Sequence, residues 1–359
     1  MVVSTRSQFL LNGDTNKPVS YLQAGPDTNT LIVLVHGWPE VAAIWKSQLD
    51  TLSNLGFYVV ALDLPGCGDS FRTRNPRDYS LESTNATFLA LLKHLGRSEA
   101  VWIGHDWGAT LVWSFVAHYP QNCIGASSMC VPYRTLEFGI KEGLVKYSNR
   151  DIYPEDQFPY AQWDYQAFYE NPDTWPKAIQ DYEADIPNFL RLIYRKGSPE
   201  GKGKPSFTAS ITKNNGWFGG QDKPPALPLD TDILDQDTFD QMSNAYQKSG
   251  FWDISAYYLN HDVNARYTHD WSVNDGVISV PTLFVEALWD YTCDCQDSRL
   301  AEPMRSYCRN LTEVAIEAGH WVAQEKAQEV NATLIKWIAT ALPASIWPYN
   351  STSPLKTTK

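Results

Sequence analysis

Asp106 stands at the centre of the run Gly104-His-Asp-Trp-Gly108, with an apolar stretch before it and a helical pattern after it. A small residue two positions to either side permits a sharp turn from strand to helix, which lifts the central side chain above a parallel sheet. A carboxylate in that place does not form an ordinary acyl-enzyme from an ester or an amide. It can attack an sp3 carbon that carries a leaving oxygen or halogen, and water must then cleave the alkyl ester. An epoxide ring or a carbon–halogen bond permits such an attack.

A nucleophilic carboxylate needs a base that activates water and an acid that orients the base. Among seven histidines we expect His320 to be this base, because it lies on a Glu-Ala-Gly-His-Trp loop between a predicted strand and a predicted helix. The orienting acid is predicted at Asp290, in the loop after the preceding strand. Glu286 and Asp294 are its rivals.

The run His36-Gly-Trp-Pro39 ends the first clearly buried strand. We expect this turn to aim the backbone N–H of Trp38 into the site, beside the backbone N–H of Trp107. Two such donors stabilise the oxyanion that forms when an ester is hydrolysed, and the loss of one costs about 2.7–4 kcal/mol of barrier. Trp38, Pro39 and Trp107 are also expected to contact the substrate.

These motifs together resemble those of the epoxide hydrolases in the α/β-hydrolase superfamily. HGWP, GHDWG, the loop aspartate and the late GHW occur in the expected order, and nucleophile, acid and histidine follow one another as in α/β-hydrolases. The resemblance runs from about Leu31 to Ile338. It implies an aspartate nucleophile, a helical cap domain and cap tyrosines that take part in the reaction.

Two stretches of the middle region look like the cap tyrosine motifs of that family, at 164–169 and 249–258. The resemblance implies that Tyr165 and Tyr258 hold the epoxide oxygen, and Tyr257 is the neighbour most easily confused with Tyr258. The chemistry supports this role independently. Ring opening leaves an alkoxide whose conjugate acid has a pKa well above that of a phenol, about 10, so a tyrosine O–H can protonate it.

The predicted activity is therefore hydrolysis of an epoxide to a vicinal diol through a covalent aspartyl ester, on a bulky apolar substrate. The partners are then a small-molecule epoxide and water. A competing hypothesis is a dehalogenase with the same nucleophile. Haloacetate dehalogenases typically place arginines where this chain has Trp107 and Thr110, and haloalkane dehalogenases usually have Asn in place of Trp38. A biosynthetic cyclase, in which a substrate hydroxyl opens the epoxide, and a ligand-binding protein of the same fold stay open as well.

The composition indicates an α/β enzyme and excludes several kinds of partner. Of 359 residues, 29 are basic and 41 acidic, so the net charge of −12 disfavours nucleic acid and anionic membranes. No apolar run has the roughly 18 residues of a membrane span, and none near the start suits a signal peptide, so we expect a cytoplasmic protein. A homodimer remains open.

The six cysteines do not form a recognisable metal motif. Cys293 and Cys295 make a CxC pair without a second ligand cluster, which favours free thiols. We expect neither a metal nor a cofactor.

Apolar runs of strand length alternate with helical patterns, which is typical of an α/β fold: a mostly parallel sheet with helices on both faces. Strands are predicted at 31–35, 57–62, 100–104, 281–286 and 311–316, and helices at 81–95, 109–118 and 324–341. Between these groups the region is rich in aromatic residues and poor in strand-like runs, which indicates an inserted helical cap. We predict core segments at 1–132 and 267–345, a cap or lid at 133–266, and a mobile tail at 346–359.

Overall fold

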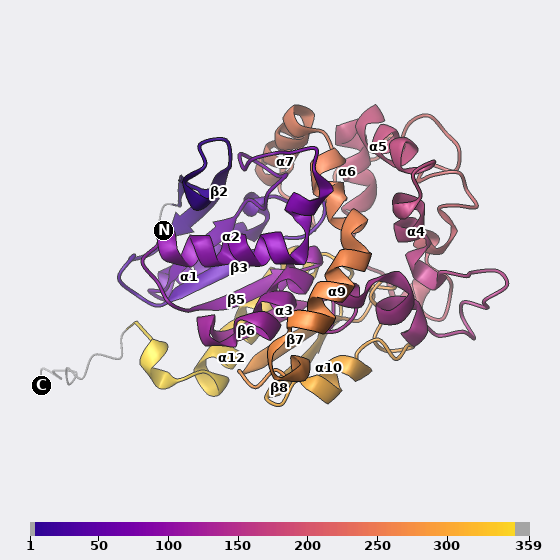
Figure 1. Ribbon diagram of the computed structural model, residues 1–359. Coiled ribbons are helices and arrows are strands. Elements are labelled where there is room, and N and C mark those ends of the chain that lie inside the picture. The colour runs from indigo at the N-terminus through magenta and orange to yellow at the C-terminus, as the bar shows by residue number, and fades with distance from the viewer. Residues whose placement is uncertain (1–3, 349–359) are drawn as a thin grey trace, which may run out of the picture.

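The computed structural model, which describes residues 4–348, has one eight-stranded sheet with helices on both faces (Figure 1). Its centre is formed by three short apolar strands, β3 (Leu31–Val35), β4 (Tyr58–Leu62) and β5 (Ala100–His105), in which every residue is buried. Strands that are covered on both faces have continuous apolar sequences of this type. The predicted fold class, a mostly parallel sheet with helices on both faces, is confirmed.

The sheet has the order β1-β2-β4-β3-β5-β6-β7-β8. Strands β3 to β8 are parallel to one another, whereas β1 pairs antiparallel with β2, and β2 pairs antiparallel with β4. The remaining strands are β1 (Thr5–Leu10), β2 (Pro18–Ala24), β6 (Cys123–Met129), β7 (Thr282–Ala287) and β8 (Leu311–Ile316). Because β3, β5, β7 and β8 run in one direction, the loops at their carboxyl ends meet at a single edge.

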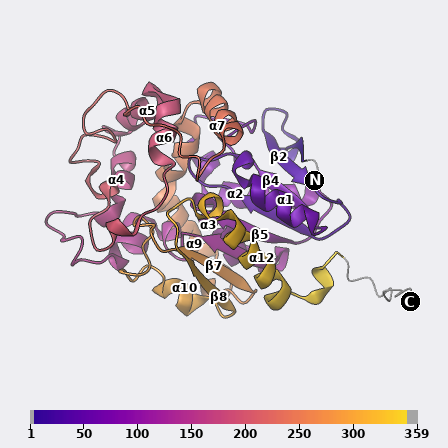
Figure 2. The ribbon, with the colours of Figure 1, turned by 180° about the vertical axis from the view of Figure 1, so that it is seen from behind.

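Helices of the core pack on opposite faces of this sheet. Helix α1 (Lys46–Asn54) contacts α12 (Ala327–Ala341), whereas α2 (Leu81–His94) contacts α3 (Trp107–His118). The view from behind shows α12 in front of the sheet (Figure 2). Between β7 and β8 lies the short helix α10 (Glu302–Tyr307).

The segment between β6 and β7 contains helices and no strand among the described residues. These helices are α4 (Asp164–Glu170), α5 (Trp175–Ala184), α6 (Ile186–Ile193), α7 (Gln236–Ser249), α8 (Trp252–Ser255) and α9 (His261–Trp271). Helices α4 to α7 gather on the side of the molecule away from both termini (Figure 1). The predicted cap segment 133–266 ends inside α9, and its limits remain our proposal. Of the predicted tail, residues 349–359 lie outside the described part of the chain.

Most of the strands and helices expected from the sequence are present in the structure, and the differences concern three strands and one helix. The five predicted strands are present within one residue of their expected ends, but the prediction missed β1, β2 and β6. The single helix predicted at 324–341 is wrong: the chain forms α11 (Val322–Glu325) and α12, separated by Lys326 at φ −126° and ψ 43°. The break accompanies a contact between distant segments, because the carboxylate of Glu325 accepts hydrogen bonds from the backbone N–H groups of Gly319 and Gly197.

Among residues 4–348, no helix combines the length and the apolar character that crossing a bilayer requires.

Candidate active site

Asp106 occupies a strained turn between β5 and α3, with φ 51° and ψ −124°. The flanking glycines make this turn possible. A Cβ atom on Gly104 would lie 2.3 Å from the carbonyl oxygen of Gly108, and one on Gly108 would lie 2.1 Å from that of Val35. Both distances are shorter than real contacts, so the sheet and α3 can approach this closely only where side chains are absent.

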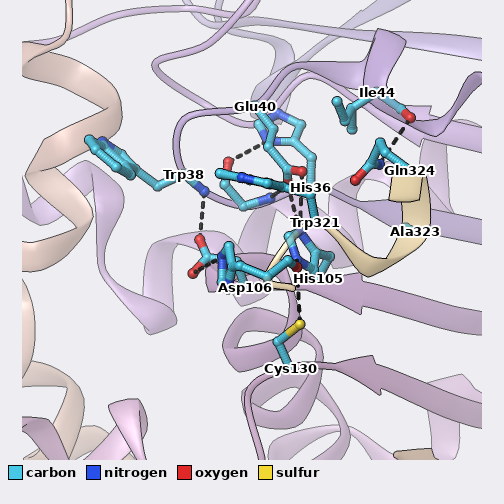
Figure 3. A network of polar contacts seen from close by, with 12 residues as sticks. His36, Trp38, Glu40, Ile44, His105, Asp106, Cys130, Trp321, Ala323 and Gln324 are labelled. Carbon is cyan, nitrogen blue, oxygen red and sulfur yellow. Dashed lines mark hydrogen bonds and ion pairs between the residues drawn. The ribbon is translucent and has the colours of Figure 1, made fainter. Parts of the chain in front are cut away.

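The turn after β3 brings a backbone donor to the same carboxylate. The backbone N–H of Trp38 donates a hydrogen bond to Oδ1 of Asp106 at 2.7 Å (Figure 3). The preceding Gly37 is necessary for this approach, because a Cβ atom there would lie 2.4 Å from Oδ1. One carboxylate oxygen is thus held by the main chain, whereas Oδ2 forms no hydrogen bond with the backbone among the described residues.

His320 lies between the two carboxylates that were predicted to flank it. Its Nδ1 is 2.6 Å from Oδ2 of Asp290, and its Nε2 is 3.5 Å from Oδ2 of Asp106. The second oxygen of Asp290 accepts hydrogen bonds from the backbone N–H groups of Thr292 and Cys293, which fix the orientation of the carboxylate. The structure therefore brings Asp106, His320 and Asp290 into one chain of contacts.

The rival acids lie in other hydrogen-bond networks. Glu286 accepts a hydrogen bond from the side chain of Gln296 at 2.7 Å. Asp294 accepts hydrogen bonds from the backbone N–H groups of Gln296 and Asp297. Within the described chain, neither carboxylate forms a hydrogen bond or an ion pair with His320, which leaves Asp290 as the partner of the imidazole.

Burial and charge act in opposite directions on this histidine. Burial alone would lower the pKa of His320, but the negative charge of Asp290 and the hydrogen bond to Asp106 outweigh it and raise the pKa well above its ordinary value. Burial likewise would raise the pKa of Asp290, but the charge of His320 and the hydrogen bonds from His320, Cys293 and Thr292 together outweigh it and lower the pKa. The pair consequently favours an imidazolium beside an ionised carboxylate.

A second buried pair, which was not expected from the sequence, supports the same loops. The fully buried carboxylate of Glu40 lies 3.1 Å from Nδ1 of His105 and accepts the backbone N–H of Gly37. Nε2 of His105 lies 2.8 Å from the backbone oxygen of His320. Figure 3 shows Glu40 and His105 behind Asp106, with the thiol of Cys130 below them. In the sequence, Glu40 stands between the HGWP run and the apolar residues 41–45. A single acidic residue in such a stretch was the signal that could have indicated a buried carboxylate.

Tyr165 and Tyr258 come from separate cap elements and face the same cavity as Asp106. Their ring centroids are 5.9 Å apart. Burial raises the pKa of both phenols, so both stay protonated at neutral pH and can act as proton donors. Tyr257 instead donates its hydroxyl hydrogen to the backbone oxygen of Pro65 at 3.1 Å, outside the cavity lining.

The cavity has a volume of about 460 Å³ and a largely apolar wall. Trp38 lines it, as do several aliphatic and aromatic side chains: Val131, Leu136, Leu144, Trp163, Trp217 and Leu300. Two other residues expected at the substrate lie outside the lining. Pro39 directs its backbone oxygen to the hydroxyl of Tyr194 at 3.0 Å, and the buried ring of Trp107 packs edge-on against Tyr258.

None of the six cysteines, all of which lie within residues 4–348, forms a disulfide bond. Within residues 4–348, two groups of three side chains lie close enough to share a cation: His105 with Cys130 and His320, and Asp290 with Cys293 and His320. Both groups include His320. A metal there would compete with the hydrogen bond between His320 and Asp290.

Replacing Glu40 by Gln tests the structural value of the buried pair. The amide keeps an oxygen for the N–H of Gly37 but loses the charge attraction to His105. We expect the free energy of unfolding to fall by about 1–3 kcal/mol in chemical denaturation. The control is Glu329→Gln, because Glu329 is an exposed residue with only a 3.8 Å contact to Lys326, and it should change stability by less than about 0.5 kcal/mol. Equal effects of the two substitutions would contradict this interpretation.

The chain is similar to known proteins both in sequence and in fold. The sequence profile described as alpha/beta hydrolase fold matches residues 30–327. Epoxide hydrolase A of Mycobacterium tuberculosis is 27% identical over 88% of this chain and 92% of its own length. Bifunctional epoxide hydrolase 2 of Sus scrofa is 27% identical over 86% of this chain, which spans 51% of that protein. The solved structure of Epoxide Hydrolase A from Mycobacterium thermoresistibile has a TM-score of 0.73 at 24% identity, covering 95% of this chain and 100% of that one, a likeness of fold.

Proposed function

The chain belongs to the alpha/beta hydrolase fold family, and we propose that it hydrolyses an epoxide to a vicinal diol through an ester formed with Asp106. The observation that carries the proposal is the combination of a carboxylate at the elbow with two buried phenols in one apolar cavity. An elbow carboxylate suits attack on an alkyl carbon, and the phenols suit the protonation of a departing alkoxide. The names of the similar proteins point to the same chemistry.

In the first step, Oδ2 of Asp106 attacks an epoxide carbon, and the carbon–oxygen bond of the ring breaks. The electron pair goes to the ring oxygen, which takes a proton from Tyr165 or Tyr258. Oδ1 remains on the backbone N–H of Trp38, where it becomes the carbonyl oxygen of the new ester. The two carboxylate oxygens therefore have different roles before the reaction begins.

In the second step, Nε2 of His320 takes a proton from water, whose oxygen attacks the carbonyl carbon of the Asp106 ester. The oxyanion forms on Oδ1, beside the donor that already holds it. Collapse of the tetrahedral intermediate breaks the bond between the carbonyl carbon and the substrate oxygen, and that oxygen takes the second proton of the former water. The diol then leaves, and Asp106 is again a carboxylate beside the protonated His320. The N–H of Trp107 is proposed as the second donor to the oxyanion.

Ester formation also prepares the base. The hydrogen bond that the protonated His320 donates to Asp106 is one of the influences that raise the pKa of His320, and alkylation removes the negative charge of Asp106. The pKa of His320 therefore falls when the intermediate forms, and its proton passes to the phenolate left by ring opening. A neutral imidazole is then present at the stage that requires a base. The charge of Asp290 remains and orients the ring.

Substitution of His320 by Gln should separate the two steps. Attack by Asp106 needs no base, whereas hydrolysis of the ester does, so the variant should accumulate an alkylated protein. Intact-mass spectrometry after incubation with an epoxide should show a mass increase of one substrate molecule. The matched control is Asp106→Ala with His320 intact, which should show neither adduct nor turnover. A His320→Gln protein without an adduct, from an epoxide that the wild type converts, would contradict the two-step scheme.

Removal of the phenol hydroxyls should slow ring opening. We expect Tyr165→Phe and Tyr258→Phe together to reduce the single-turnover rate of alkylation by about 10²–10⁴-fold, the usual contribution of positioned proton transfer. Tyr257→Phe is the control, because its hydroxyl contacts Pro65 outside the cavity lining. An unchanged alkylation rate in the double variant would remove the phenols from the mechanism.

The pH dependence of ester hydrolysis should report on His320. The imidazole must be neutral, so the rate of breakdown of the alkyl-enzyme should fall as the pH drops through the pKa that His320 has in the intermediate. Asp290 raises that pKa, and Asp290→Asn should therefore move the midpoint to lower pH while also reducing the limiting rate. Stopped-flow measurement of the second step gives both quantities, and a midpoint that stays in place or rises would argue against this assignment.

A further inference from the structure

Cys293 differs from the other cysteines of the chain in its exposure and in its place. All six cysteines belong to the described residues, and Cys293 alone among them is not buried. It lies three residues after Asp290 in the same loop and lines the cavity that contains Asp106. Its backbone N–H helps to orient Asp290, but the proposed reaction gives no role to its thiol.

The thiol of Cys293 completes a group of three side chains that can ligate a metal ion. Its sulfur, a carboxylate oxygen of Asp290 and a ring nitrogen of His320 all lie within 4.8 Å of one another. Thiolate, imidazole and carboxylate are the ligands that Zn²⁺ uses in proteins, at distances of about 2.0–2.3 Å. Three atoms this close need only small displacements to reach such distances. Because Cys293 and His320 both line the cavity, an ion can enter through it and keep water as its fourth ligand.

The other group of this kind is already engaged in hydrogen bonds. Both ring nitrogens of His105 have partners, the carboxylate of Glu40 and the backbone oxygen of His320. The thiol of Cys130 donates to that same backbone oxygen at 3.2 Å. His105 is fully buried, Cys130 is 2% exposed, and both lie outside the cavity lining. An ion that arrives from solvent therefore meets the group of Cys293 and not this one.

The charge around Cys293 also favours a cation. Asp290 and Asp106 contact the two ring nitrogens of His320, at 2.6 and 3.5 Å, so two carboxylates lie beside the ligand group. The net charge of −12 attracts cations to the chain at longer range. The spacing of the cysteines does not reveal the group, because its histidine comes from the loop after β8.

We propose that Asp290, Cys293 and His320 form an inhibitory site for a thiophilic divalent cation such as Zn²⁺. The ion displaces the proton of the Cys293 thiol and one proton of the His320 ring, and both protons pass to the solvent. A ligated imidazole is held by the ion instead of by Asp290, so it no longer takes a proton from water. The binding of the ion does not depend on the proposed function, whereas the inhibition does.

Binding is tested on the wild-type protein without substrate. Titration with Cd²⁺, a spectroscopic substitute for Zn²⁺, should produce the ultraviolet charge-transfer absorption of a cadmium–thiolate bond and reach a plateau at one ion per chain. Isothermal titration calorimetry with Zn²⁺ should give the same stoichiometry. Mg²⁺ prefers oxygen ligands and should give no signal in the calorimeter at the same concentration.

Substitutions assign the signal to one thiol. Cys293→Ser and Cys293→Ala should abolish the absorption and weaken Zn²⁺ binding by at least about tenfold, since the loss of a residue that only supports a ligand already costs about 10–100-fold. The matched control is Cys295→Ser, because that thiol is buried and donates to the backbone oxygen of Cys293 at 3.3 Å. It should retain the absorption, as should Cys130→Ser, which tests the other group.

Inhibition is measured with an epoxide that the metal-free wild type converts. Saturating Zn²⁺ should lower turnover by about 10²–10⁴-fold, the usual contribution of a positioned base, and a chelator should restore it. Cys295→Ser should respond in the same way and Cys293→Ser should resist, each compared with its own metal-free rate.

The outcomes separate this site from the proposed function. A wild type without the cadmium–thiolate absorption, or an absorption that survives Cys293→Ala, would overturn the cation site and leave epoxide hydrolysis standing. Stoichiometric Zn²⁺ binding with unchanged turnover would overturn the inhibitory role. Failure of the metal-free wild type to convert any epoxide would overturn the proposed function, and the cation site would still be decided by the absorption and the calorimetry.

Discussion

The close approach of two backbone segments at Asp106 is the constraint on which the site depends. The strand β3 and the turn after it lie so near to the elbow that neither Gly37 nor Gly108 could carry a side chain. That proximity lets the main chain at Trp38 bond one oxygen of Asp106. The carboxylate of Asp106 is therefore oriented by backbone geometry, which a substitution at a distant side chain cannot easily change.

Much of the fold and of the site follows from local sequence features. The elbow glycines, the strand-length apolar runs and the positions of Asp290 and His320 after successive strands are each visible within a few residues. Parallel strands place their carboxyl ends at one edge, which is why residues far apart in the chain meet there. Acids from the same region, such as Glu286, could be separated from Asp290 only by their hydrogen bonds.

Several features depend on contacts between distant segments and were not visible. The edge strand β1 is mostly exposed and polar, and β6 is rich in small residues, so neither has the apolar run of a buried strand. The partnership of Glu40 with His105 needs two loops to be placed side by side. The break at Lys326 arises because Glu325 bonds the backbone of a cap residue and of the His320 loop. None of these can be deduced from periodicity.

The single carboxylate oxygen of Glu325 that joins Gly197 to Gly319 also has a mechanical consequence. Cap and core share that acceptor, so the cap cannot lift at this point without freeing the main chain next to the imidazole. If the cap opened, the loop that carries His320 would lose this hydrogen bond. The imidazole that we propose as the base is therefore held in position only while the cap is closed.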